Sequence, residues 1–294
     1  MTRLRDMLAR ELHEDNRRSW NSATKAHNSH KGDQAAYLRS GGSTLFPEEV
    51  ELLGDIAGAR LVHLQCNSGQ DSLSLAASGA DVTGVDISDE AIDFATRLSA
   101  DSGIAATFTR SDLFDWFDQA AAASEHFDIA FSSYGAIVWL SDLESWAAGI
   151  ASVLRPGGRL VFVEFHPILG MFNWGWEVKH DYWMRGHVHE TWPDGVGDYV
   201  RLAGEGLVPW GYQEGMAEVP DPAPCHQFPW GISDVIGALR RAGLILDVFE
   251  EYPWSNGAVL CGNMRELPGR RFVAPAGVPD FPQMYGIRAL KPAD

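Results

Sequence analysis

Several features are scarce or missing in this chain of 294 residues. Its three cysteines, Cys66, Cys225 and Cys261, are an odd and scattered set that matches no disulfide framework or metal spacing and is typical of a reducing compartment. No run of about 18 apolar residues is present, which excludes a membrane-spanning helix. The N-terminus has no apolar stretch of signal-peptide length. We therefore expect a soluble, cytoplasmic protein without a membrane partner.

Basic residues are also in short supply. Lys and Arg number 23 against 40 Asp and Glu, so the formal net charge is −17. Such a surface repels phosphate backbones, and we expect no nucleic-acid partner. Apolar residues make up 45% of the chain and charged residues 21%, which is the balance of a globular protein with a sizeable core.

From about residue 58, apolar runs alternate with helix-like segments. The runs are almost continuous Val, Ile, Leu and Phe, which is typical of parallel strands buried on both faces. The alternation predicts an α/β protein with a Rossmann-like, open, mostly parallel sheet and helices on both faces. The predicted strands cover residues 61–64, 81–86, 106–109, 127–132, 159–165, 244–250 and 284–290. The predicted helices cover residues 71–77, 88–99, 140–154 and 232–242, with a turn at 155–158 and a Pro/Gly loop at 253–280.

The N-terminal segment carries an apolar stripe at helical spacing, formed by Leu4, Met7, Leu8 and Leu12. The body of the protein, or a second copy in a homodimer, would have to cover it. The chain thus divides into a helical lid at 1–54, a core at 55–165, an inserted cap with hairpin-like strands at 166–230, and a closing helix and strands at 231–294.

Small and polar residues follow the predicted strands at their carboxyl ends, where open parallel sheets bind ligands. Asp86, after the second strand, can accept two hydrogen bonds from a ribose diol, although a carboxylate there can also cap a helix or face solvent. Asp112, after the third, can accept from the exocyclic amine of adenine, with Leu113 beside the ring. The candidate cofactor-binding residues are Gln65, Cys66, Asn67, Gly69, Asp71, Asp86, Ile87, Asp112, Leu113 and Ser132.

Four motifs occur in a characteristic order: LQCNSGQDSLSL at 64–75, VTGVDIS at 82–88, SDL at 111–113 and LRPGG at 154–158. Together they resemble the class I S-adenosylmethionine-dependent methyltransferases. NRRSW at 16–20, followed by His27, is similar to the lead-in of bacterial small-molecule members. The resemblance implies S-adenosylmethionine as the cofactor, with Gly69 at its methionine end, Asp86 on the ribose and Asp112 at the adenine.

The first motif departs from the family pattern, which has a carboxylate followed by a glycine-rich turn. Here His63 stands at the acidic position and Gly69 is the one glycine that is retained. We therefore expect cofactor contacts to shift to the side chains of Gln65, Asn67 and Asp71.

Aromatic residues are concentrated in the cap, where six of the 11 tryptophans lie between residues 170 and 230. They predict a pocket for a flat or apolar acceptor, with cation–π contacts if it is an amine, or else a small core of the insertion itself. The candidate substrate residues are Trp174, Trp176, Trp183 and Trp230.

Histidines are also frequent in the cap. Their spacing matches no standard zinc pattern, so we expect no metal site. The residues concerned are His180, His187, His189 and the pair Cys225 and His226.

Three residues are candidate catalytic groups: His166 after the fifth strand, Tyr134 after the fourth, and His27 in the lid. Each also suits a structural role in holding a loop, packing or capping. The predicted function is methyl transfer from S-adenosylmethionine to an oxygen or nitrogen of a hydrophobic or aromatic small molecule, in secondary metabolism. A non-catalytic cofactor-binding protein is one alternative. A nucleotide-dependent dehydrogenase is another, disfavoured because the Gly-any-Gly pyrophosphate turn is absent.

Overall fold

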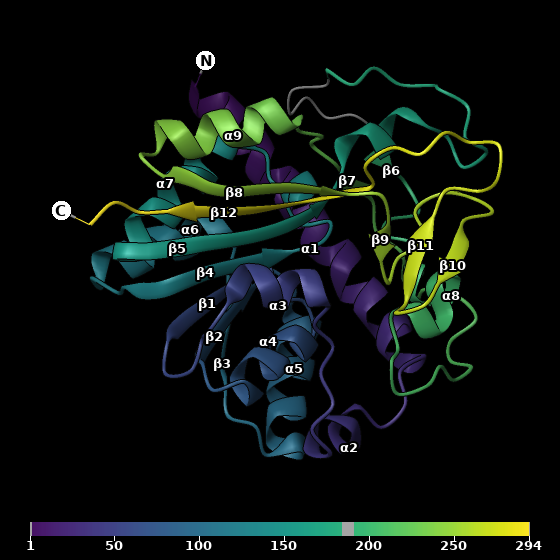
Figure 1. Ribbon diagram of the computed structural model, residues 1–294, viewed down its shortest axis with the longest axis horizontal. Coiled ribbons are helices and arrows are strands. Elements are labelled where there is room, and N and C mark those ends of the chain that lie inside the picture. The colour runs from purple at the N-terminus through teal and green to yellow at the C-terminus, as the bar shows by residue number, and fades with distance from the viewer. Residues whose placement is uncertain (1, 184–190, 294) are drawn as a thin grey trace.

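The computed structural model describes residues 2–183 and 191–293. Its centre is a seven-stranded sheet in the order β3-β2-β1-β4-β5-β12-β8, and Figure 1 shows these strands side by side. Neighbouring strands are parallel except for β12, which runs antiparallel to β5 and β8. The bounds are β1 (Arg60–Leu64), β2 (Asp81–Asp86), β3 (Thr107–Arg110), β4 (Phe127–Ser133), β5 (Leu154–Phe165), β8 (Ile245–Tyr252) and β12 (Met284–Leu290). The predicted open, mostly parallel sheet is confirmed.

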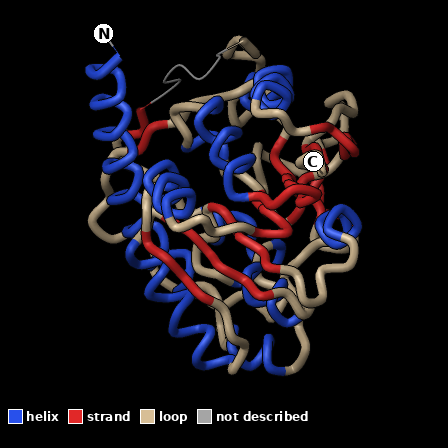
Figure 2. Tube along the Cα trace, turned by 90° about the vertical axis from the view of Figure 1, so that its left-hand side faces the viewer, coloured by secondary structure: helices blue, strands red, loops and turns tan. Residues whose placement is uncertain are grey.

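Helices cover both faces of this sheet, and Figure 2 shows them on either side of the strands. One face packs Leu75 and Leu52 against Phe131, and the other packs Trp146 against Phe162, all of them buried. The helices of the first face are α3 (Pro47–Leu53), α4 (Gln70–Ala77) and α5 (Asp89–Ser102), and those of the second are α6 (Leu113–Ala122), α7 (Leu143–Val153) and α9 (Ile232–Arg241).

Some local predictions need correction. Helix α6 is not indicated by the apolar pattern, and it begins where the Asp112 carboxylate accepts the Phe114 N–H at 2.9 Å. Helix α7 begins later than predicted because Asp142 caps its first turn. The predicted turn at 155–158 falls inside the bounds of β5, at an irregularity in its pairing with β4.

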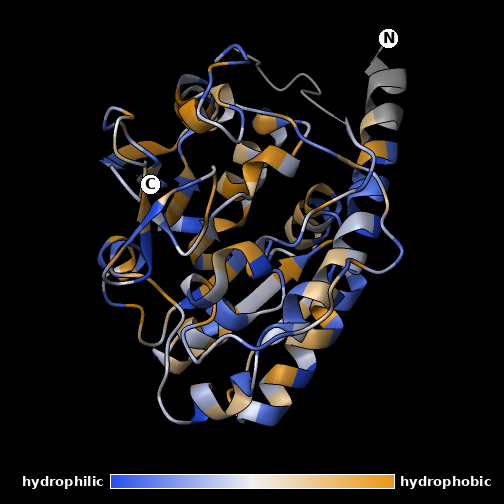
Figure 3. Ribbon diagram, turned by 90° about the vertical axis from the view of Figure 1, so that its right-hand side faces the viewer, coloured by the Kyte–Doolittle hydropathy of each residue, from blue (hydrophilic) through white to orange (hydrophobic). Residues whose placement is uncertain are grey.

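A long N-terminal helix, α1 (Thr2–Ser29), connects the core to the cap. Figure 3 shows it as largely hydrophilic, and its buried face includes Asn16 and Ser19. The Asn16 amide exchanges two hydrogen bonds with the backbone of His226, and Ser19 Oγ accepts the Val196 N–H at 2.8 Å. Of the predicted apolar stripe, the side chains of Leu4, Met7 and Leu8 lie outside the described residues, and Leu12 is half-buried. No described helix meets the length and apolarity needed to cross a membrane.

The predicted loop at 253–280 is wrong in part, because it contains a three-stranded antiparallel sheet. Its strands are too short to show a two-residue period. The bounds are β9 (Ser255–Asn256), β10 (Arg265–Leu267) and β11 (Arg271–Val273). The cap contributes the helix α8 (Tyr199–Ala203) and the 3-10 helices η2 (Pro167–Met171) and η3 (Gly204–Gly206). It also contributes the short antiparallel pair β6 (Thr191–Trp192) and β7 (Cys225–His226).

Candidate cofactor and acceptor site

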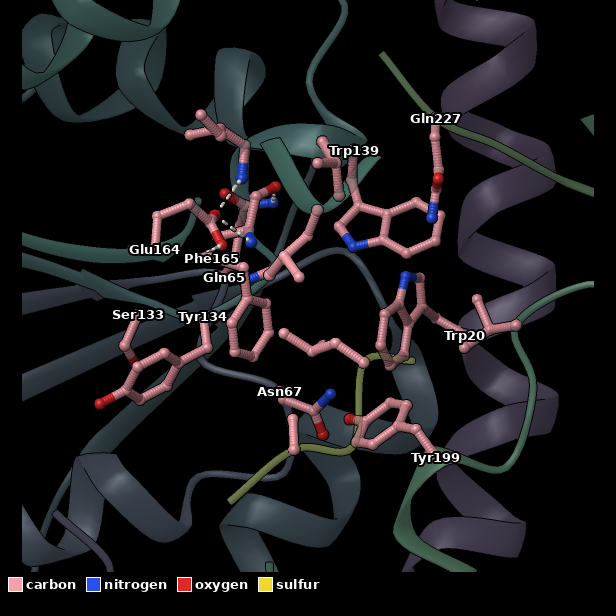
Figure 4. Close-up of a pocket in the computed structure, with 18 of the residues that line it drawn as sticks. Trp20, Gln65, Asn67, Ser133, Tyr134, Trp139, Glu164, Phe165, Tyr199 and Gln227 are labelled. Atoms are coloured by element: carbon pink, nitrogen blue, oxygen red, sulfur yellow. Dashed lines mark hydrogen bonds between the residues drawn. The ribbon is translucent and has the colours of Figure 1, made fainter. Parts of the chain in front are cut away.

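A cavity of about 1090 Å³ lies along the carboxyl ends of β1, β2, β4 and β5. Its wall is built from these strand ends, α1, the cap and the β9–β11 sheet. Parallel sheets place ligands at this edge, and the volume exceeds that of a common small-molecule site. Figure 4 shows part of the wall, where aromatic and amide side chains surround a common space.

The turn after β1 has an unusual backbone. Gln65, Asn67 and Gly69 all have positive φ, at 55°, 47° and 78°. A Cβ on Gly69 would lie 2.7 Å from that of Ala95, so glycine is required there by backbone and space, although Gly69 itself does not line the cavity. Gln65 donates to the Ala136 carbonyl at 2.9 Å, and its buried Oε1 has no partner in the part of the chain that the structure describes.

Asp86 ends β2 with its carboxylate held in place by backbone groups. One oxygen accepts the Asn67 N–H and the other the Ser88 N–H, both at 2.8 Å. A carboxylate has about four acceptor sites, so one on each oxygen remains for a ligand. Burial raises the pKa of Asp86 to about 6 against the opposing effect of these N–H groups. The arrangement fits a sugar diol.

Asp112 has two partners besides any ligand. It caps α6, and its Oδ2 is 2.8 Å from His13 Nδ1, on α1. Burial raises its pKa, but hydrogen bonding and charge from His13 outweigh burial and leave the pKa lowered. Ile87 and Leu113 line the cavity nearby. His13 is a wall residue that the motifs do not indicate.

Of the remaining predicted cofactor residues, three line the cavity and one is buried in the core. Asn67, Asp71 and Cys66 line the cavity. Asp71 accepts the Thr44 hydroxyl at 2.5 Å, and burial raises the pKa of the Cys66 thiol well above its usual value. Ser132 is fully buried and does not line the cavity. Because successive side chains of a strand point to opposite faces, its neighbour Ser133 lines the cavity instead.

His166 lines the cavity with both ring nitrogens engaged. The Ile168 N–H donates to Nδ1 at 3.2 Å, so the neutral ring carries its proton on Nε2 and donates it to Glu251 at 3.1 Å. Burial lowers the pKa of His166, opposed by Glu251. The ring also caps the short helix η2.

Tyr134 and His27 are placed differently. Tyr134 lines the cavity, and its hydroxyl oxygen accepts the Asn256 amide at 2.9 Å, pointing away from the central space in Figure 4. His27 does not line the cavity and packs behind Tyr199, with ring centroids 4.1 Å apart. Burial lowers the pKa of His27 to about 4.

Glu164, at the end of β5, is a site residue that the sequence reasoning missed. Its buried carboxylate accepts the N–H groups of Ala136 at 2.8 Å and Ile137 at 3.2 Å, and also that of Gly135. Burial raises its pKa, partly offset by these donors. The carboxylate therefore holds the loop after β4 against the cavity, and no local pattern distinguishes it from an ordinary strand residue.

The aromatic wall comes from several parts of the chain. Trp20 of α1 meets Trp139 edge to face at 5.4 Å and Tyr199 of α8 at 6.2 Å, and Phe165 faces them across the space in Figure 4. Together with Tyr134, these residues form what we call the aromatic chamber. Trp20 and Trp139 lie outside the predicted aromatic cap, whereas Tyr199 lies within it.

The predicted tryptophans meet the cavity only in part. Trp230 lines it and donates to the Leu140 carbonyl at 2.9 Å, and Trp174 lines it while 55% exposed. Trp176 donates to Gly262 at 2.6 Å, and neither it nor the 61% exposed Trp183 belongs to the wall. They therefore lie in the outer part of the cap.

No cluster of potential metal ligands is found in the part of the chain that the structure describes. Cys225 and His226 sit on β7, where His226 contacts Asp15 and Thr191. His187 and His189 lie outside the described residues.

Comparisons with known proteins match part of the chain to methyltransferases. Residues 62–158 match the methyltransferase domain family. The chain is 32% identical over 107 residues to a ubiquinone biosynthesis O-methyltransferase of Aromatoleum aromaticum, covering 36% of this chain and 44% of that protein. It is 32% identical over 119 residues to an S-adenosyl-L-methionine-dependent Diels-Alderase of Talaromyces variabilis, covering 40% of each. The chain thus spans less than half the length of either relative.

The fold is shared more widely. A crystal structure of an S-adenosylmethionine-dependent methyltransferase from Mesorhizobium loti superposes with a TM-score of 0.54 at 20% identity, covering 85% of this chain and 99% of that one. Residues 62–158 therefore form a methyltransferase domain, and the chain has the fold of an S-adenosylmethionine-dependent methyltransferase, as the motifs predicted.

Proposed function

We propose that the protein transfers a methyl group from S-adenosylmethionine to an oxygen or nitrogen of a hydrophobic or aromatic small molecule, a secondary metabolite. The observation that carries this proposal is one continuous cavity. It joins the carboxylates at the ends of β2 and β3 to the aromatic chamber. A cofactor and a flat acceptor can therefore share one space.

The residues at the strand ends suit the cofactor. Asp86 offers two free acceptor positions to the ribose hydroxyls, and Ile87 and Leu113 offer apolar surface to the adenine. The unpartnered Gln65 Oε1 can accept from the cofactor's ammonium group. When bound, the cofactor supplies an activated sulfonium methyl group to the acceptor.

The aromatic chamber supplies alignment and a dry environment. Trp20, Trp139 and Tyr199 present ring faces and edges to the acceptor and exclude water from the reacting atoms. Alignment of two reactants is worth effective molarities of about 10⁵–10⁸ M, and dispersal of the sulfonium charge is favoured where water is excluded. Because the methyl donor is already activated, these two contributions supply much of what methyl transfer needs.

The acceptor's proton needs a destination when the nucleophile is a hydroxyl. His166 is our candidate base, because it lines the cavity and contacts Glu251. To accept a proton, its Nδ1 must exchange the Ile168 N–H for the acceptor, and the Glu251 carboxylate would then stabilise the imidazolium. An amine with a free lone pair needs no such exchange. Tyr134 and His27 are better suited to shaping the wall.

A second candidate is a protein that uses the bound cofactor without transferring its methyl group. Two observations favour it: each candidate base is engaged by protein groups, and one relative is named as a cofactor-dependent Diels-Alderase.

The two functions differ in a measurable product. We expect S-adenosylhomocysteine to form when the protein is incubated with S-adenosylmethionine and a panel of phenols, indoles and amines. The Asp86→Ala variant serves as a control for cofactor-dependent turnover. Tight cofactor binding with no S-adenosylhomocysteine on any acceptor would favour the second candidate, and absence of binding would reject both.

A further inference from the structure

Two cationic side chains, Lys31 and Arg270, line the cavity. Lys31 follows α1, and Arg270 lies in the turn between β10 and β11. Within residues 2–183 and 191–293, neither forms an ion pair with a carboxylate. Among the described residues, the Arg270 guanidinium donates to two backbone carbonyls, that of Thr44 at 3.1 Å and that of Gly206 at 3.2 Å. Desolvated cations are normally paired, because an isolated one is costly.

Arg270 is also placed in a strained way. Its φ is +62°, in the left-handed region that favours glycine or asparagine, and its guanidinium stacks over the Phe46 ring at 4.1 Å. Burial lowers the pKa of Arg270, and burial also lowers that of Lys31 to about 8. Backbone strain and burial of charge at one position are typical of a site with a function in binding.

The surroundings identify the kind of group that these cations would meet. Thr44 connects Arg270 to Asp71, since its carbonyl accepts from Arg270 and its hydroxyl donates to Asp71 at 2.5 Å. The negative charge of Asp71 acts on the pKa of both Arg270 and Lys31, raising it against the larger effect of burial. Asp71 lies in the first turn of α4, directly after the Gly69 turn. This end of the cavity therefore presents two cations and one carboxylate. These charges complement the carboxylate and the ammonium group of an α-amino acid.

A third donor belongs to the same region. Trp210 lines the cavity, and its buried Nε1–H has no hydrogen-bond partner among the described residues. Its ring packs against Tyr37 at 5.3 Å and lies beside Gly32, next to Lys31. A buried N–H without a partner is rare unless a ligand satisfies it.

We propose that Arg270 and Lys31 together bind the carboxylate of the cofactor's amino-acid end, so that the β9–β11 sheet, outside the matched domain at 62–158, is part of the cofactor site. This inference rests on the proposed function, because it takes S-adenosylmethionine as the ligand. Through the charge of Arg270, the β9–β11 sheet would favour a cofactor that retains its carboxylate.

The test measures binding by titration calorimetry with three ligands. S-adenosylhomocysteine has the whole amino acid, its decarboxylated analogue keeps the amine, and 5′-methylthioadenosine lacks both. We expect Arg270→Met to weaken S-adenosylhomocysteine about tenfold or more, the effect of losing a charge-assisted hydrogen bond. Lys31→Met should act in the same direction, and Arg270→Lys should restore part of the affinity. Methylthioadenosine should bind all variants within about twofold.

The matched control is Arg265→Met, since Arg265 lies on β10 of the same sheet and outside the cavity wall. It should leave all three affinities unchanged. The wild-type protein should also prefer S-adenosylhomocysteine over its decarboxylated analogue by about tenfold, which tests the idea even if Arg270→Met does not fold.

Several results would overturn the inference. Equal loss for S-adenosylhomocysteine and methylthioadenosine in Arg270→Met would make the residue structural. Unchanged binding of both, with a raised KM for the methyl acceptor, would assign the cations to an anionic acceptor instead. No wild-type preference for the carboxylate would reject the site while leaving the proposed function standing. Failure of the wild type to bind any of the three ligands would reject the proposed function itself.

Discussion

Replacing Asp86 by alanine should weaken cofactor binding by more than tenfold. The carboxylate is fixed by the N–H groups of Asn67 and Ser88 and keeps one acceptor position free on each oxygen. A hydrogen bond to a charged group contributes about 1.5–3 kcal/mol, and about 1.4 kcal/mol corresponds to a factor of ten. Loss of even one ribose contact thus predicts at least about a tenfold change, and loss of both predicts about a hundredfold change or more.

The assay is calorimetric titration of S-adenosylhomocysteine into the wild type, Asp86→Ala and the control Asp81→Ala. Asp81 is exposed and begins the strand that Asp86 ends, so its replacement should have no effect on affinity. Equal affinity in wild type and Asp86→Ala would remove Asp86 from the site and refute the reasoning.

The same carboxylate predicts a pH dependence. Because burial raises the pKa of Asp86 to about 6, its ionised form is lost as the pH falls through that value. The affinity of the wild type should therefore decrease between pH 7.5 and pH 5, and that of Asp86→Ala should change much less. Parallel pH profiles for the two proteins would contradict this assignment.

Three further outcomes are expected. Gly69→Ala should lower the free energy of unfolding by about 1–3 kcal/mol in urea titrations, because it combines a positive φ with a close approach to Ala95; a change under about 0.3 kcal/mol would show that the turn relaxes. Burial lowers the pKa of His63 from 6.5 to about 4. Because the imidazole takes up a proton more readily in the unfolded chain, the free energy of unfolding should decrease as the pH falls from about 6.5 to 4. His63→Gln should show less of this loss than the wild type, and equal slopes would contradict it. His166→Ala should lower turnover more than cofactor affinity, whereas full turnover would leave His166 with only its capping role at η2.

The sequence alone determined the fold class and the edge of the sheet at which the cavity lies. Parallel strands are buried on both faces, so they appear as continuous apolar runs, and β4 begins at the predicted residue 127. Once the strand order is known, the residues after each strand must meet at one edge. Asp86 and Asp112 could be placed in this way without any knowledge of long-range contacts.

The aromatic chamber, and the end of the cavity that carries Lys31 and Arg270, were decided by tertiary structure. Trp20 and Tyr199 are far apart in the chain and meet only because α1 crosses from the core to the cap. Arg270 reaches the cavity from a turn between strands of three residues, too short to carry a pattern. The local sequence indicates which residues are buried and whether a segment has the period of a helix or a strand. The wall of the cavity depends instead on which distant segments pack together. The contact of His166 Nε2 follows from the same cause, since Glu251 comes from β8.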